Sequence, residues 1–369
     1  MGRTSEGIGC DWRMDFLVKR DGLSECRVAD SAAIELEPGQ SLLEISAFGL
    51  TSNNITYAVF GEAMSYWSFF PVEEGWGRIP VWGFADVAAS KHDDLPEGTR
   101  VFGYLPMSAD LVVIPDRVDQ RGFVDASPHR SGLPSAYNGY ARVSADAAYD
   151  PRYEDQQMLL RPLFITSFLI DDFLDDSGFF DASTAVLSSA SSKTAIGIAF
   201  LLGQRNGIEV IGLTSPANAG FVQGLGIYDR VVTYDAIDSL PEGTAVYVDM
   251  SGNAAVRSAV HHHYREGLRH DSVVGDTHWD HPGGGAPELP GPQPAFFFAP
   301  DRLAKRTKEW GHEGFDARLG EAWHRFVHWS GQWLEVVRGN GPEAVERVYL
   351  ELLAGRTDPS VGHILSMQV

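Results

Sequence analysis

The stretch between Thr184 and Pro300 constrains the fold more strongly than any other part of the chain. Short apolar runs alternate in it with stretches of helical periodicity, as where TAVLSSA is followed by KTAIGIAFLLGQ. Five or six strands that alternate with helices are typical of a doubly wound parallel sheet, whose crossover connections are right-handed. The sequence therefore predicts an α/β domain over residues 161–300.

The turn after the first of these strands has the composition of an anion site. Over residues 186–202 a short apolar strand leads through a run of serines into a helix that begins near Lys193. Unpaired N–H groups at a helix N-terminus favour a pyrophosphate, provided that the side chains allow close approach. The three glycines of the dinucleotide-binding fingerprint fall here on Ser189, Ser192 and Ala195, which are small but keep a Cβ.

The serine-rich turn has two other possible roles, a helix N-cap and a nucleoside triphosphate loop. A serine before a helix is also an ordinary N-cap, because its side chain satisfies one of the first helical N–H groups. The tetrapeptide SSKT lacks the glycines of a Walker loop, which disfavours hydrolysis of nucleoside triphosphates. The flanking strands and helices favour the dinucleotide site, and we expect it to include Ser189, Ser191, Ser192, Lys193 and Thr194.

The end of the next strand indicates which coenzyme binds. The run EVIGLTS ends in Thr214 and Ser215, about 20 residues after the turn, where an NAD-specific site places a carboxylate on the ribose. Hydroxyl groups at this point leave room for a 2′-phosphate, and Lys193 supplies a cation in the same crevice. We therefore expect NADPH as the cofactor, with Thr214, Ser215 and Asn218 among its contacts.

The remainder of the chain has a different organisation. Residues 14–50 and the segments that follow read as short strands separated by Gly and Pro, as in a small irregular barrel. The pattern weakens between residues 135 and 162, and the chain beyond residue 300 is helical until a last strand-like run, VGHILSMQV. We expect two domains, one formed by residues 1–160 with 301–369 and the other by residues 161–300.

Composition excludes several classes of partner. The chain carries 50 acidic against 29 basic residues, a formal charge of −21, which repels the phosphates of a nucleic acid. The start of the chain lacks an apolar signal region, and no segment approaches the roughly 18 uninterrupted apolar residues that span a bilayer. Two cysteines supply neither a disulfide framework nor a Cys-rich metal site. We expect a cytoplasmic protein that binds a small molecule, not a nucleic acid or a membrane.

Several segments resemble a known superfamily. SLLEISAFGLTSNN, RIPVWGFADV, EGTRVFGY and LGIYDRVVTYD are similar to stretches of the medium-chain dehydrogenases and reductases, and specifically of their zinc-free quinone and enoyl reductase branch. The resemblance covers nearly the whole chain, and SSASSKTA, GLTS and VGDTHW mark a branch of its own. It implies a GroES-like β-rich catalytic domain, a Rossmann domain that binds NADPH, reduction of an activated C=C bond, and a homodimer.

The resemblance also implies a reacting centre between the two domains, which must work without zinc. The places of the catalytic zinc ligands fall near Asn53 and at Phe84 and Ala85, none of which forms a zinc site. Carbonyl polarisation must then come from hydrogen bonds. The candidate proton donors are Tyr57, Tyr66 and His278; Asn53, Asn54 and Phe296 are expected to contact substrate, and Thr166, Gly275 and Phe298 to contact the cofactor.

Each of these roles has a simpler alternative. A single tyrosine is most often a packed aromatic ring. Adjacent histidines, as at residues 261–263, point in different directions on a helix, so we expect no metal site there or at His270, His278 and His281. The carboxylates of Asp171, Asp172, Asp175 and Asp176 are expected to be a solvated helix face, and the Trp-rich stretch 310–333 is expected to be core or subunit contact.

Two other functions stay open. A zinc-free ketone reductase would need a strong proton donor near the carbonyl oxygen. A non-catalytic NADPH-binding or sensor protein would keep the cofactor site alone, because a fold does not determine a function.

Overall fold

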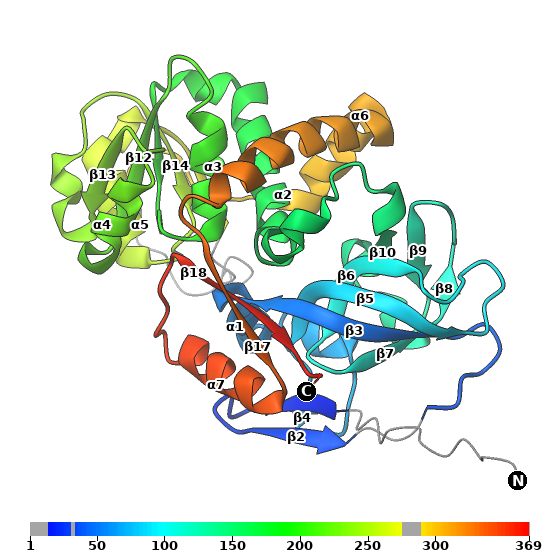
Figure 1. Cartoon of the computed structure of the whole chain (residues 1–369). Coiled ribbons are helices and arrows are strands. Elements are labelled where there is room, and N and C mark those ends of the chain that lie inside the picture. The colour runs from blue at the N-terminus through cyan, green and yellow to red at the C-terminus, as the bar shows by residue number, and fades with distance from the viewer. Residues whose placement is uncertain (1–13, 31–33, 275–288, 369) are drawn as a thin grey trace, which may run out of the picture. The chain divides into compact units, whose positions relative to one another are not determined.

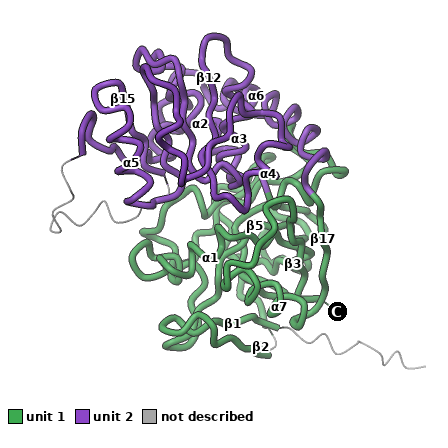
Figure 2. Tube along the Cα trace, turned by 90° about the vertical axis from the view of Figure 1, so that its left-hand side faces the viewer, with its two compact units in different colours: residues 1–159, 335–369 green, residues 160–334 purple. Residues whose placement is uncertain are grey.

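The computed structural model describes residues 14–30, 34–274 and 289–368, which form two compact units. Unit 1 comprises Met1–Leu159 with Glu335–Val369, and unit 2 comprises Leu160–Leu334, so the chain leaves the first unit, builds the second and returns (Figure 2). The sequence pattern predicts that the inserted domain ends at residue 300. The unit instead continues to residue 334, because the long helix α6 (Ala299–Ser330) packs on helix α2 (Glu154–Asp176) through stacked rings of Phe164 and Phe326, 4.5 Å apart.

Unit 1 is built mainly from antiparallel strands. Its larger sheet has the order β17-β18-β3-β5-β6-β10-β9-β8, with β7 paired to β3, and a second sheet has the order β2-β1-β4. The central pairing joins β3 to β5, as Figure 1 shows. The strands are β1 (Met14–Lys19), β2 (Cys26–Asp30), β3 (Ser41–Leu50), β4 (Trp76–Gly77), β5 (Pro80–Ser90), β6 (Arg100–Pro106), β7 (Asp110–Val113), β8 (Pro115–Asp116), β9 (Gly122–Asp125), β10 (Gly139–Arg142), β17 (Glu335–Asn340) and β18 (Val361–Ser366).

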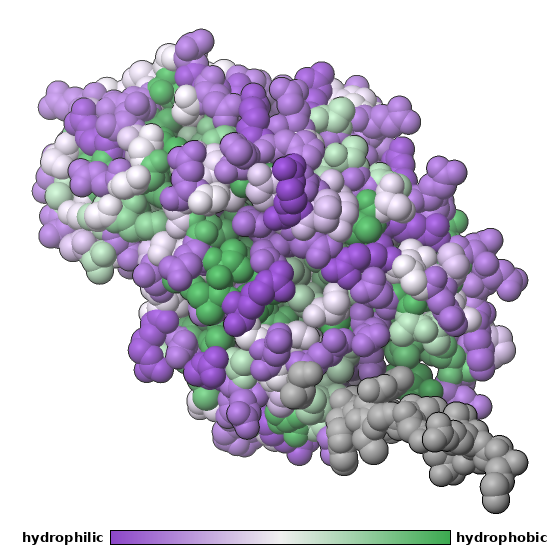
Figure 3. Space-filling model, in the orientation of Figure 1, coloured by the Kyte–Doolittle hydropathy of each residue, from purple (hydrophilic) through white to green (hydrophobic). Residues whose placement is uncertain are grey.

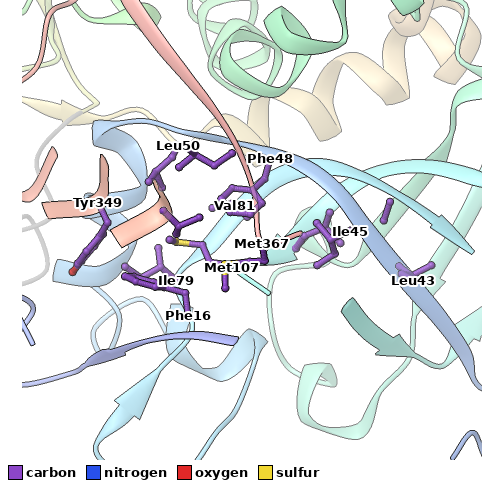
Figure 4. Close-up of a cluster of buried hydrophobic side chains, with 14 of the residues drawn as sticks. Phe16, Leu43, Ile45, Phe48, Leu50, Ile79, Val81, Met107, Tyr349 and Met367 are labelled. Carbon is purple, nitrogen blue, oxygen red and sulfur yellow. The ribbon is translucent and has the colours of Figure 1, made fainter. Parts of the chain in front are cut away.

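The core of unit 1 joins the two ends of the chain. Phe16 from β1, Phe48 from β3 and Met367 after β18 belong to one buried cluster, to which helix α7 adds Tyr349 (Figure 4). Burial of such side chains is the main favourable contribution to folding. The helices of this unit are α1 (Ser52–Val59), α7 (Pro342–Leu353) and the 3₁₀ segments η1 (Tyr66–Phe69), η2 (Pro128–Arg130), η3 (Ser135–Tyr137), η4 (Val143–Ala145) and η5 (Pro151–Tyr153).

Unit 2 contains a parallel sheet with the order β13-β12-β11-β14-β15-β16. The chain order runs outward in both directions from the neighbours β11 and β14, which is the switch point where open α/β sheets place ligands. The doubly wound sheet and the β-rich unit confirm the predicted fold class. The strands are β11 (Thr184–Leu187), β12 (Glu209–Thr214), β13 (Arg230–Thr233), β14 (Ala245–Asp249), β15 (Leu268–Val273) and β16 (Ala295–Phe296).

Helices cover both faces of this sheet (Figure 1). On one face Ile170 of α2 and Ile198 of α3 pack with Leu187 of β11, and on the other Val260 of α5 packs with Val186. Apolar residues therefore occupy consecutive strand positions, as expected for strands that are buried on both sides. The remaining helices are α3 (Lys193–Leu202), α4 (Ala219–Gly224), α5 (Ala254–Tyr264), η6 (Gly178–Asp181), η7 (Pro216–Asn218), η8 (Tyr234–Ser239) and η9 (Arg265–Gly267).

Two of the four carboxylates at the end of α2 are buried, so the expectation of a solvated helix face is wrong for Asp171 and Asp172, whereas Asp175 and Asp176 are exposed. Asp172 accepts hydrogen bonds from Arg302 and from Arg306, whose Nε lies 2.7 Å away. Asp171 is bound by Arg205, with Nε 2.7 Å from Oδ1. The helical spacing of the carboxylates gave no sign of these arginines, because Arg302 and Arg306 are about 130 residues away in sequence.

The face of the molecule in Figure 3 is mostly hydrophilic. Within the ranges that the structure describes, no helix combines the length and apolar character that a membrane crossing requires. In the Trp-rich stretch, Trp323 is buried, as the sequence analysis expects of a core residue.

Candidate functional site

The serine-rich turn between β11 and α3, residues 188–193, is called the cradle below. Ser192 is the N-cap of α3, and its Oγ accepts a hydrogen bond from the Ala195 N–H at 3.3 Å. The Ser192 N–H donates to the Ser189 carbonyl at 2.7 Å and closes the turn. Ser189 has a φ of 47°, the left-handed conformation that glycine adopts most readily. The cradle thus has the backbone of a glycine turn without the glycine.

Two of the predicted cofactor residues are hydrogen-bonded to each other. Asn218 Nδ2 donates to Ser191 Oγ at 3.0 Å, although 27 residues separate them. Ser215 is part-buried at the N-cap of η7, and Lys193 is part-buried at the first position of α3. Thr214 is buried, so in this structure its hydroxyl is not exposed for a cofactor contact.

Three polar groups that sequence reasoning missed hold the cradle in place. The Ser188 hydroxyl donates to Asp249 Oδ1, the Tyr234 hydroxyl accepts from the Ser189 N–H at 2.9 Å, and the Tyr228 hydroxyl donates to the Ala190 carbonyl at 2.8 Å. Two of these groups could have been found from the sequence, because each is a polar residue at the carboxyl end of an apolar run. Ser188 follows TAVL, and Asp249 ends AVYVD.

The charge on Asp249 is neutralised locally. Its carboxylate is fully buried and pairs with Arg257 of α5, whose Nε lies 2.8 Å from Oδ2. The same carboxylate accepts hydrogen bonds from Ser251 and from the Gly252 N–H. A buried carboxylate beside the cradle would otherwise repel a phosphate. Small side chains, a helix N-terminus and a compensated charge therefore fit the pyrophosphate of a dinucleotide.

Helix α2 packs against α3, the helix that follows the cradle. Ser167 Oγ donates to the Thr194 carbonyl at 2.8 Å, and Gly197 of α3 lies so close to α2 that a Cβ on it would be 2.5 Å from Ser167 Oγ. Thr166, the predicted cofactor contact, is the part-buried neighbour of Ser167. Thr194 itself is buried.

A cavity of about 400 Å³ lies at the opposite end of α3. Its lining includes Gly203 and Arg205 after the helix, and Tyr228, whose hydroxyl reaches the cradle at Ala190. This cavity is separate from the predicted cofactor residues.

Unit 1 brings four tyrosines together, called the tyrosine cluster below: Tyr57, Tyr66, Tyr104 and Tyr137. The ring centroids of Tyr57 and Tyr66 are 4.6 Å apart, and those of Tyr104 and Tyr137 are 4.7 Å apart. Both predicted tyrosine donors thus lie in one group, whereas Tyr104 and Tyr137 were not predicted. Trp82 packs against the cluster.

Burial controls the ionisation of the cluster. Burial, reinforced by Tyr137, raises the pKa of Tyr57 far above its usual range, and the nearby Trp82 and Asn53 side chains oppose that shift. Burial, with a further contribution from the neighbouring Tyr57, raises the pKa of Tyr66 to about 12, and the Tyr137 side chain opposes that shift. The hydroxyls therefore stay protonated at neutral pH and are available as hydrogen-bond donors.

The two predicted substrate contacts at the start of α1 differ. Asn54 is buried, and its Oδ1 accepts from the Thr51 N–H at 2.8 Å while its Nδ2 donates to the Pro80 carbonyl at 2.9 Å. Its side chain is thus engaged in capping α1 and tying it to β5. Asn53 is only part-buried and lies near the Tyr57 hydroxyl.

The remaining described candidates, Phe296 and Phe298, lie in and just after β16, the edge strand of the parallel sheet. Phe296 and Phe298 stack with ring centroids 6.2 Å apart, and Phe298 is exposed. Phe297, between them, packs into the apolar cluster beside α2. Gly275 and His278 lie outside the described residues.

The histidine run contains a buried pair instead of a metal cluster. His261 and Asp271 are fully buried, with His261 Nε2 2.9 Å from Asp271 Oδ2, and Nδ1 of the same ring faces the Pro290 carbonyl at 2.8 Å. Burial raises the pKa of Asp271, and the histidine opposes that shift. In the described part of the chain, no three His, Cys, Asp or Glu side chains are grouped so that they could hold a metal ion.

The fold is similar to that of several solved structures. CurA from Vibrio vulnificus, in its complex with NADPH, is 15% identical, with a TM-score of 0.55 over 93% of this chain and 94% of that one. A mutant enoyl thioester reductase from Candida tropicalis is 10% identical, with a TM-score of 0.56 over 96% and 99%. The quinone oxidoreductase from Coxiella burnetii is 12% identical, with a TM-score of 0.51 over 96% and 99%.

Sequence comparison gives one family. No curated protein matches the chain. The family model described as "Protein of unknown function (DUF2855)" matches residues 48–358, well over half of the chain. The chain therefore belongs to the DUF2855 family.

Proposed function

We propose that this protein is an NADPH-dependent, zinc-independent oxidoreductase that reduces an activated C=C bond in an enone, enoyl or quinone-type substrate. The observation that carries the proposal is the cradle, in which Ser189 adopts a glycine-like turn at the switch point of the parallel sheet. The NADPH complex of CurA, with the same fold, supports the choice of cofactor.

Residues of unit 2 would hold the cofactor. Ser191, Ser192 and the N-terminal turn of α3 would bind the pyrophosphate, and Lys193 with Ser215 would receive the 2′-phosphate. Asn218 would keep the cradle closed through its hydrogen bond to Ser191. When bound, NADPH supplies a hydride to the β-carbon of the substrate.

Residues of unit 1 would complete the reaction. After hydride addition the electron pair of the C=C bond resides on the conjugated oxygen as an enolate. The Tyr57 hydroxyl would then give a proton to the α-carbon, and water would return a proton to the tyrosine. The sum is one enone, one NADPH and one proton converted to a saturated carbonyl compound and NADP⁺. Tyr66 is the alternate donor, and Asn53 would orient the Tyr57 hydroxyl.

Calorimetric titration with NADPH and with NADH tests the first half of this proposal. We expect heat of association with both coenzymes and tighter binding of NADPH. Absence of binding to either would refute the dinucleotide site.

Oxidation of NADPH with a panel of enones, quinones and saturated ketones tests the second half. Turnover of enones but not of saturated ketones is expected, and Tyr57→Phe should lower that turnover without changing NADPH affinity. Turnover of ketones alone would assign carbonyl reduction, and binding of NADPH without any turnover would assign a sensor. Sedimentation measures the homodimer that we also propose.

A further inference from the structure

Two buried polar atoms beside the tyrosine cluster lack a hydrogen-bond partner of good geometry among the described residues: Tyr104 Oη and Trp82 Nε1. The indole N–H of Trp82 lies near the Tyr57 hydroxyl, whose pKa it lowers, without forming a well-aligned bond to it. Tyr104 is fully buried. An unpaired buried donor is uncommon, because its desolvation is not compensated by a bond within the fold. We therefore consider whether a bound ligand supplies the missing hydrogen-bond acceptor.

The two donors lie on the same face of the sheet. Trp82 of β5 and Tyr104 of β6 are directly paired across the strands, and their ring centroids are 5.1 Å apart. Side chains of such a pair stand next to each other on one face.

Flat rings surround this pair. Tyr57 packs edge-on against Tyr104 at 5.6 Å between centroids, and Tyr137 packs against both Tyr104 and Trp82. Tyr66 and Tyr137 keep some exposure and stand on the short segments η1 and η3, so they are the rings past which a ligand would enter. The surroundings suit a flat, conjugated, uncharged molecule.

A neighbouring tyrosine shows the contrast. Tyr140 of β10 is also buried, but its hydroxyl donates to the Tyr104 carbonyl at 2.8 Å and accepts from Arg130 at 3.3 Å. Within the described residues, the hydroxyl of Tyr140 thus has two partners in unit 1 and the hydroxyl of Tyr104 has none.

We propose that Tyr104 Oη and Trp82 Nε1 form a donor pair that binds the oxygen of a flat conjugated carbonyl compound. In the proposed reduction, on which this second part rests, the same two bonds stabilise the negative charge that develops on that oxygen when hydride adds to the β-carbon. The pair would take the place of a Lewis acid, and the nearby Tyr57 would deliver the proton. No covalent bond to the protein forms or breaks in this step.

The test uses 4-phenylbut-3-en-2-one carrying ¹³C in its carbonyl group as the probe, without NADPH. In the unaltered protein the bound carbonyl stretch should shift to lower frequency, because both donors bond to the oxygen. Tyr104→Phe and Trp82→Phe should each lose part of that shift and raise the dissociation constant roughly tenfold.

Thermal unfolding separates this role from a structural one. Tyr104→Phe should not lower the unfolding midpoint, because the fold loses no hydrogen bond. The matched control Tyr140→Phe should lower the midpoint and keep the carbonyl shift. An unshifted carbonyl band, an unchanged band in Tyr104→Phe, or no binding of the probe at millimolar concentration would overturn the donor pair. If the probe binds as expected but NADPH does not, the proposed reductase fails while the carbonyl site stands.

Discussion

The Ser188 hydroxyl donates a 2.8 Å hydrogen bond to Asp249 Oδ1 and so joins the carboxyl ends of β11 and β14. Ser188 Oγ also accepts from the N–H groups of Met250 and Ser251. The first residue of the cradle is thereby fixed to the loop that follows the neighbouring strand. The position of Ser188 thus depends on the buried carboxylate of Asp249, while Tyr228 and Tyr234 bind the next two residues of the cradle.

Asp249→Asn should destabilise the protein by about 3–5 kcal/mol, because it removes one charge of a buried ion pair that Asp249 forms with Arg257. NADPH affinity should fall as well, since the Ser188 anchor weakens. Urea unfolding and calorimetry measure the two effects. Glu25→Gln, which breaks the exposed pair with Lys19, is the control and should leave both quantities unchanged. A stable variant with normal affinity would show that the anchor is dispensable.

Gly197→Ala should destabilise unit 2 by about 1–3 kcal/mol, because the new methyl group would press against Ser167 and force α2 away from α3. The same substitution at Gly220 of α4, which has open space around it, is the matched control. There the higher helix propensity of alanine should be neutral or stabilise by up to about 1 kcal/mol. Chemical denaturation of the two variants makes the comparison, and equal effects would contradict the close approach of α2 and α3.

Lys193→Ala should weaken NADPH binding far more than NADH binding. A charge-assisted hydrogen bond to phosphate contributes about 1.5–3 kcal/mol, and only NADPH carries the 2′-phosphate. Calorimetric titration of the variant with each coenzyme measures the difference. An equal loss for both would place Lys193 at the pyrophosphate, and no loss would remove it from the site.

Stability should fall as the pH rises above roughly 10, the ordinary pKa of tyrosine in an unfolded chain. Burial raises the pKa of the clustered tyrosines, to about 12 for Tyr66, so above pH 10 the unfolded chain releases protons that the folded protein retains. The stabilising contribution is complete below pH 10 and is lost as the pH climbs through the folded-state values.

Tyrosinate absorbance and circular dichroism, followed together during an alkaline titration, check this expectation. The cluster should ionise only when the fold is lost, and Tyr66→Phe should move the alkaline midpoint upward. Ionisation of the cluster within an intact fold would show that its hydroxyls are solvated.

Local sequence patterns predicted the elements that carry the candidate cofactor site. The run TAVL, the serines after it and the helix from Lys193 are consecutive in the chain, so periodicity and capping chemistry indicate them directly. Asn218 and Ser191 were expected separately as cofactor contacts, and only the structure shows the hydrogen bond between them.

Long-range pairing explains what the patterns missed. Helix α6 was expected in the first domain, since nothing in its own sequence shows that Arg302 and Arg306 bind Asp172. Asn54 was expected to contact substrate. In the folded chain its side chain is instead hydrogen-bonded to the Pro80 carbonyl, a contact that the local sequence does not reveal.

The sequence by itself determined the parallel sheet, the cradle and the two-unit organisation, because hydrophobic period and turn chemistry act between residues that are close along the chain. Only the tertiary structure decided which polar groups find partners: Asp249 with Arg257 and Ser188, and Tyr104 with none among the described residues. The burial of a side chain and its hydrogen-bond partners depend on contacts between segments that lie tens or hundreds of residues apart in the chain. A local sequence pattern carries no information about such contacts.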